Sequence, residues 1–220
     1  MATFLFALNT MKVDLYTAAG EKKGSLDLSK DIFGAKINSD LMHRAVVMRL
    51  ANARRPIAHT KTRGEVAYST RKIFKQKGTG NARRGARSTN LLRGGGVTHG
   101  PRNTANYSKM MPKKERRAAL FSALSAKAEA KAIFGLEKFA SKTPKTKEFV
   151  SLLAKLPAGK RHLFVIPAKD EVFMKSCANI PGVDVIMAQY LNPYDVLQAD
   201  QVCLLKDSVS VIETTFKTQK

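Results

Sequence analysis

The chain has 220 residues with 39 Lys and Arg against 17 Asp and Glu, and its formal net charge is +22. This charge far exceeds what solubility requires, so it predicts a polyanionic partner, either a nucleic acid or an anionic membrane surface. Hydrophobic residues make up 44% of the sequence, which is enough for a folded core. They occur in short runs, and none approaches the roughly 20 apolar residues of a membrane span.

Two cysteines, Cys177 and Cys203, lack the spacing of metal ligands. A secreted protein of this size more often carries several cysteine pairs, so the composition favours a reducing cytosol and buried free thiols. Residues 1–10 contain a short apolar run without a basic segment before it, which argues against a secretory signal. We expect residues 1–10 to form a tail, with Met11 as an alternative start.

The first regular elements follow this tail. The strings KVDLY (12–16) and SLDLS (25–29) have the alternation of strands separated by a turn. Apolar residues at spacings of three and four then predict an amphipathic helix over 40–53, and Asn38 or Ser39 could cap it.

Residues 54–109 show no helical period, and eight glycines are scattered there between arginines and lysines. From Arg54 to Arg117 the chain has eighteen Lys and Arg against two acids, Glu65 and Glu115, which is a net charge of +16. Such a composition does not form a hydrophobic core of its own. We therefore expect residues 54–111 to be an extended basic loop.

Regular structure returns at Pro112, a good first residue for a helix with the sequence KKERRAALFSALSAKAEA. The early lysines of this helix oppose its dipole, which indicates an anionic partner.

Apolar runs and helical segments then alternate. Strands are expected at 132–139, 161–166, 183–189 and 201–205. Helices are expected at 144–156, with Thr143 as the cap, at 170–180, at 192–200 and from Asp207. This alternation predicts an α/β fold, a three-layer globular domain with a mostly parallel sheet. The domain would span 11–220 and be interrupted by the loop at 54–111.

No pattern for nucleotide binding or catalysis is present. Gly78, Gly80 and Gly85 have neither Walker nor dinucleotide-fingerprint spacing. Glu65, the single acid among residues 54–109, is better suited to fixing an arginine than to base catalysis. The four histidines have no acid and nucleophile at a recurrent motif spacing: His43, His59, His99 and His162. We expect no catalytic residue, no metal and no cofactor.

The basic loop itself favours RNA or DNA, since it lacks the large apolar residues with which a helix enters a membrane surface. Glycine permits close backbone approach to a groove, and arginine offers a planar fork for phosphates and a flat face for bases. Three alternatives stay open: a disordered basic segment that binds any polyanion, a regulator that binds messenger RNA or DNA such as an operon repressor, and an RNA-acting enzyme.

The string KTRGEVAYSTRKIFKQKGTGNARRGARSTNLLRGGGVTHGPR, then MPKKERRAALFSALS and the late NPYDVLQADQVCLL, resembles the bacterial form of ribosomal large-subunit protein four. The resemblance covers the chain from Met11. It implies an α/β domain near the surface of the large subunit and a long loop that enters ribosomal RNA. It also implies a cytoplasmic location in the ribosome and three partners: large-subunit ribosomal RNA, neighbouring large-subunit proteins and the nascent peptide.

Motif matches carry the family's residues onto this chain: Lys61, Thr62, Arg63, Glu65 and Val66, then Gln76, Lys77, Gly78, Thr79, Gly80 and Arg83, then Arg93, Gly94, Gly95 and Gly96. The resemblance implies that Gln76, Lys77 and Gly78 line the peptide exit tunnel. The family usually has a tryptophan before RQKG, where this chain has Phe74 and Lys75, and a tryptophan or another aromatic residue before RGGG, where this chain has Leu92. The full set expected to bind RNA is Arg54, Arg55, Lys61, Arg63, Arg71, Lys72, Lys75, Gln76, Lys77, Gly78, Thr79, Gly80, Arg83, Arg84, Arg87, Arg93, Gly94, Gly95, Gly96, His99, Arg102, Lys113, Lys114, Arg116 and Arg117.

Overall fold

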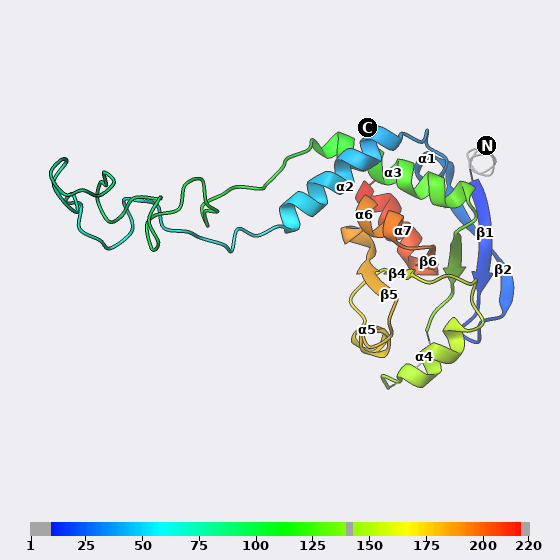
Figure 1. Cartoon of the computed structure of the whole chain (residues 1–220). Coiled ribbons are helices and arrows are strands. Elements are labelled where there is room, and N and C mark those ends of the chain that lie inside the picture. The colour runs from blue at the N-terminus through cyan, green and yellow to red at the C-terminus, as the bar shows by residue number, and fades with distance from the viewer. Residues whose placement is uncertain (1–9, 140–142, 217–220) are drawn as a thin grey trace. The chain divides into compact units, whose positions relative to one another are not determined.

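The computed structural model describes residues 10–139 and 143–216 (Figure 1). The chain forms two compact units. Unit one is the chain up to Arg49 together with the chain from Met110 onward, and unit two is Leu50–Lys109. The tail expected at 1–10 lies outside the described residues except for Thr10, which begins the first strand.

Unit one is built on a six-stranded sheet with the order β2-β1-β3-β6-β4-β5. Its strands are β1 Thr10–Tyr16, β2 Lys22–Ser29, β3 Ile133–Leu136, β4 His162–Ile166, β5 Val183–Met187 and β6 Gln201–Leu205. The β1 and β2 pair is antiparallel, and all the other neighbours in the sheet are parallel. The predicted, mostly parallel sheet is confirmed.

Helices cover both faces of this sheet, because side chains along a strand point alternately to opposite sides. On β4, Leu163 and Val165 join one core, whereas Phe164 and Ile166 join another. The first core is closed by α1 Lys30–Phe33, α3 Lys113–Glu129, α6 Pro193–Gln198 and α7 Lys206–Phe216. The second is closed by α4 Thr146–Leu153 and α5 Glu171–Cys177. Figure 1 shows these two helical layers, and the predicted three-layer α/β class is confirmed.

Aromatic rings fill the core beneath α4 and α5. Phe149, Phe164 and Phe173 meet edge to face, with ring centroids 5.1 to 5.8 Å apart. Cys177 and Cys203 are free thiols buried in the same core, as expected. Burial raises the pKa of the Cys177 thiol to about 12 and that of Cys203 well above its ordinary value, so both behave as small apolar side chains.

Most expected helices and strands are present, but several boundaries were wrong. β2 begins at Lys22, three residues before the predicted strand, because its polar start pairs with β1, with Tyr16 opposite Lys22. The helix expected at 144–156 is α4 and begins at Thr146. Lys145 is its extended N-cap residue, and the Lys145 amide donates to Ser176 Oγ of α5 at 3.2 Å.

Helices α2 Ser39–Ala53 and α3 flank the start and end of unit two in the sequence. Asn38 caps α2, since its Oδ1 accepts a hydrogen bond from the Leu41 amide at 3.1 Å. Pro112 is the N-cap residue of α3, so the helix begins at Lys113, one residue later than predicted. Ala45 of α2 and Ala119 of α3 are both buried in one small cluster, together with Met111. No helix among the described residues is long and apolar enough to cross a membrane.

Candidate nucleic-acid interface

Unit two, every residue of which is described, has no helix after Ala53 and no strand beyond a single bridge between Lys72 and Ala86. Its two runs of chain are joined at intervals by specific contacts (Figure 1). Nearest its ends, the Asn52 side-chain amide donates to the Lys109 carbonyl at 3.1 Å and accepts from the Lys109 amide at 2.8 Å. The Arg54 guanidinium lies over the Tyr107 ring, 4.0 Å from its centroid.

Farther along, Glu65 and Arg102 form a bidentate ion pair, with Nη1 and Nη2 each 2.6 Å from a different carboxylate oxygen. Arg102 Nη1 also donates to the Thr60 carbonyl at 3.1 Å, and Glu65 Oε2 accepts from the Thr62 amide at 2.9 Å. The hydrogen bonds from Arg102, followed by the one from Thr62, hold the pKa of Glu65 well below its usual range. The prediction that Glu65 fixes an arginine is confirmed.

Two glycines of the RGGG string, Gly95 and Gly96, pack against backbone. The Gly96 amide donates to the Ser88 carbonyl at 3.0 Å, and a Cβ at Gly96 would collide with the backbone of Arg63. A Cβ at Gly95 would collide with the Thr89 carbonyl oxygen. These two glycines are therefore needed for close approach of three backbone segments within unit two.

The tip lies between Ile73 and Gly85, where the Ile73 amide donates to the Gly85 carbonyl at 3.1 Å. Gly78 and Gly80 have φ values of +83° and +67°, and space is open around both. The predicted tunnel residues Gln76, Lys77 and Gly78 are in this exposed tip. The Lys72 ammonium donates a hydrogen bond to Gln76 Oε1, so part of the glutamine side chain is already engaged.

Charge is largely unbalanced within unit two. Of its fourteen Lys and Arg, Arg102 alone pairs with a carboxylate of the unit, because Glu65 is the only acid between Leu50 and Lys109. The other thirteen cations have no carboxylate partner there. Uncovered apolar side chains accompany them: Ile57 is 86% exposed and Leu91 is 92% exposed. A surface of this kind suits a partner that brings both phosphates and flat, partly apolar bases.

The structure brings the expected RNA-binding residues together in two groups. Those from Arg54 to Arg102 belong to unit two, and Lys113, Lys114, Arg116 and Arg117 belong to the first turns of α3 in unit one. Glu115, in the same stretch of α3, is drawn aside by an ion pair with Arg44 of α2 at 2.9 Å. Lys113, Lys114 and Arg116 form no ion pair with any described residue, so this part of α3 keeps a positive charge.

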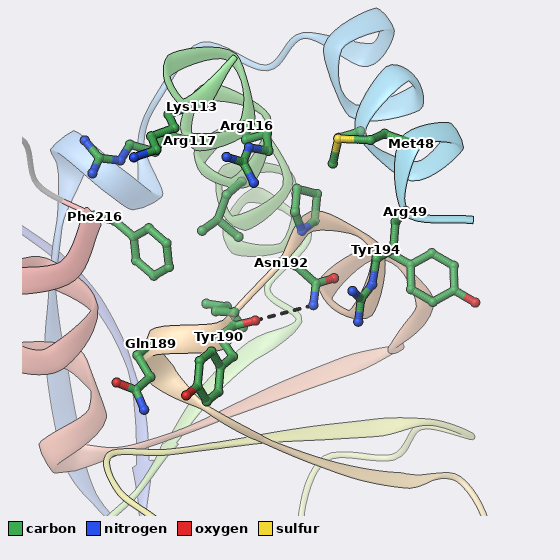
Figure 2. A pocket seen from close by; sticks show the side chains of 14 residues that line it. Met48, Arg49, Lys113, Arg116, Arg117, Gln189, Tyr190, Asn192, Tyr194 and Phe216 are labelled. Atoms are coloured by element: carbon green, nitrogen blue, oxygen red, sulfur yellow. Dashed lines mark hydrogen bonds between the residues drawn. The ribbon is translucent and has the colours of Figure 1, made fainter. Parts of the chain in front are cut away.

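Arg49, which the sequence did not single out, lines a pocket of about 340 Å³ in unit one together with Lys113, Arg116 and Arg117 (Figure 2). The opposite side of the pocket is formed by residues 189–194, which include the 3-10 helix η2 Ala188–Tyr190 and the start of α6. A lone arginine near the end of a helix gave no signal in the sequence. Only the fold places it beside residues more than a hundred positions later.

Among the described residues there is no group of three or more His, Cys, Asp or Glu that could hold a metal ion. His162 is buried at the start of β4, and its Nε2 lies 3.1 Å from the Pro157 carbonyl oxygen. His59 Nδ1 accepts from the Asn103 amide at 3.5 Å. These contacts tie both rings to local backbone.

Comparison with known proteins assigns the chain. Residues 26–215 match the model of the ribosomal protein L4/L1 family. A large ribosomal subunit protein uL4 of Symbiobacterium thermophilum is 43% identical over 202 residues, which cover 92% of this chain and 97% of the relative. Those of Natranaerobius thermophilus and Alkaliphilus metalliredigens are 43% and 38% identical over 205 residues, covering 93% of this chain and 99% of each relative. The chain belongs to the ribosomal protein L4/L1 family.

Proposed function

We propose that the chain is a structural component of the large ribosomal subunit that binds large-subunit ribosomal RNA through unit two. The observation that carries this proposal is the set of thirteen cations without a carboxylate partner in a unit whose two runs are joined by hydrogen bonds and a single ion pair rather than by a hydrophobic core. The names of the relatives support the ribosomal setting. The protein works by binding and positioning, without catalysis.

RNA supplies what unit two lacks. Phosphates balance the arginines and lysines, and the counterions released from RNA drive association. Bases cover exposed apolar side chains such as Leu91 and Ile57. In this arrangement the protein acts as a fixed counterion and spacer between crowded RNA strands and supports assembly of the subunit.

The tip has a further part in the proposal. Gln76, Lys77 and Gly78 face the peptide exit tunnel, and the nascent peptide is a passing partner there. The exposed position of these residues between Ile73 and Gly85 and the positive φ of Gly78 support a tip that fits a narrow passage. Neighbouring large-subunit proteins contact unit one, and the assembled particle is cytoplasmic.

The test combines sedimentation with crosslinking in cells that carry the full-length chain. We expect the protein to sediment stoichiometrically with large subunits and to give RNA crosslinks on peptides from Lys61 to Arg102. Replacing Lys75 and Lys77 with Gln lowers crosslinks at the tip, whereas the matched control Lys147→Gln, on exposed α4, leaves them unchanged. A protein that stays off large subunits and crosslinks to messenger RNA or DNA would instead be a regulator.

A further inference from the structure

Unit one contains a pocket that the basic loop does not use. It lies between α2, α3, residues 189–194 and the last residue of α7, and its volume is about 340 Å³. This is at the lower end of the roughly 300–1,000 Å³ typical of small-molecule sites. In Figure 2 Arg116 reaches it from α3, Phe216 from α7 and Asn192 from the chain before α6.

The pocket is positively charged on one side. Arg49 of α2 and Lys113 and Arg116 of α3 line it, and none of the three forms an ion pair with any described residue. Two acids close to the pocket in the sequence are engaged elsewhere: Glu115 pairs with Arg44 at 2.9 Å, and Asp195 accepts a hydrogen bond from Asn192 Nδ2 at 2.5 Å. Among the described residues, no carboxylate lines the pocket. Its charge therefore favours an anionic occupant.

The rest of the lining is flat and largely apolar. Met48 of α2 and the buried Leu120 of α3 lie on one side, and the half-buried Phe216 ring closes another. Tyr190 is 61% exposed at the margin, and the Gln189 amide beside it offers both a donor and an acceptor. Aromatic and apolar walls beside arginine suit a ring that carries a phosphate, because unstacked bases pack on aromatic side chains while arginine forks bind phosphate.

We propose that this pocket binds one unstacked nucleotide of an RNA strand. Arg116 and Lys113 hold its phosphate, the base lies against Phe216 and Met48, and Gln189 bonds the base edge. The inference rests on the proposed function only in that it takes the same RNA partner. It assigns unit one a nucleotide site of its own, formed by residues that the loop does not contribute.

Ultraviolet crosslinking of assembled large subunits that contain the full-length chain tests this directly. After digestion, mass spectrometry locates the peptides that carry a nucleotide adduct. We expect an adduct on Phe216 or on the peptide that includes Tyr190 and Tyr194. The double variant Lys113→Gln and Arg116→Gln lowers its yield about tenfold, since two charged hydrogen-bond donors to phosphate are lost.

Lys147→Gln on α4 is the control, because Lys147 is exposed, lies outside the pocket lining and is not among the residues expected to bind RNA. It leaves the pocket adduct at its wild-type yield. The melting temperatures of all variants are compared first, and we expect them to agree because Lys113, Arg116 and Lys147 are exposed.

Each result decides between readings. Adducts on peptides of unit two without any on the pocket peptides overturn the nucleotide site and leave the proposed function standing. Absence of adducts from both units overturns the nucleotide site and also the proposed function. An equal loss in Lys147→Gln reduces the effect to general surface charge and overturns the site. A carboxyl-to-amine crosslink from Lys113 to a neighbouring protein assigns the pocket to an acidic peptide instead.

Discussion

Glu65 and Arg102 are 37 residues apart in the sequence, yet their side chains meet through two hydrogen bonds of 2.6 Å each. This pair joins the outgoing and returning runs of unit two. Because Arg102 also bonds the Thr60 carbonyl, the pair fixes backbone as well as side chains. An arginine expected to contact RNA thus has an internal role in unit two.

Glu65→Gln leaves the shape of the side chain but removes its charge, so the bidentate pair is lost. We expect faster amide hydrogen exchange at Thr60 and Thr62, whose backbone the pair holds, in the variant than in the wild-type chain. Glu171→Gln serves as the control, since its ion pairs to Lys169, just before α5, and to Lys175 of α5 lie outside unit two. Unchanged exchange at Thr62 in Glu65→Gln would show that backbone contacts hold this part of the chain without the ion pair.

The same pair makes unit two sensitive to acid. The pKa of Glu65 is lowered from its ordinary value of 4.5, first by Arg102. A lowered folded-state pKa means that the stabilisation is complete above about pH 4.5 and is lost as the pH falls toward the folded value. Exchange at Thr62 measured from pH 6 down to pH 3 should therefore rise beyond its intrinsic pH dependence. Glu65→Gln should lack this extra rise.

Gly96→Ala places a methyl group against the Arg63 backbone, which cannot move aside as a side-chain end would. We expect the junction near Ser88 to open and the variant to enter large subunits less efficiently than the wild-type chain in a competition experiment. Gly64→Ala is the matched control, because space is open there and no positive φ is required. Equal incorporation of both variants would contradict the expectation that a methyl group at Gly96 disrupts unit two by colliding with the Arg63 backbone.

Lys77→Gln removes one exposed charge from the tip and leaves the ion pair between Glu65 and Arg102 intact. If this lysine contacts a phosphate, the slope of log affinity against log salt for large-subunit ribosomal RNA decreases in magnitude by about 0.7 to 0.9. Filter binding at several salt concentrations measures the slope. Lys147→Gln on α4 should keep the wild-type slope, and an unchanged slope in Lys77→Gln would exclude a phosphate contact with that RNA.

Phe149→Ala should destabilise unit one by about 3 to 5 kcal/mol, the usual cost of removing a buried ring. Phe149 is fully buried and meets Phe139, Phe164 and Phe173 edge to face. Urea unfolding followed by circular dichroism gives the change in the free energy of unfolding. Val150→Ala, which truncates the half-exposed neighbour on α4, should cost much less.

Much of unit one could be predicted because its central strands are buried on both faces and read as continuous apolar runs. β4 and β6 are examples, with His162–Ile166 buried throughout. The polar start of β2 was missed because its pairing with β1, not its own pattern, keeps it in the sheet. The four-residue helix α1 was missed because it is too short for a helical period to show.

For unit two the sequence predicted an irregular, basic segment but not the contacts between its two runs. Glycine in a sequence does not reveal whether it adopts positive φ in open space, like Gly78, or packs against a carbonyl, like Gly95. The pocket was also beyond sequence reasoning. Arg49 and Phe216 line the same pocket only because the fold places α2, α7 and the start of α6 around it.

The single bridge between Lys72 and Ala86 has a consequence for how this protein tolerates change in length. It closes the tip, and two further hydrogen bonds of unit two, from the Gly96 amide to the Ser88 carbonyl and from the Val97 amide to the Lys61 carbonyl, involve no residue between Ile73 and Gly85. Insertions and deletions within that interval therefore change the length of the tip while the register of the two runs is preserved.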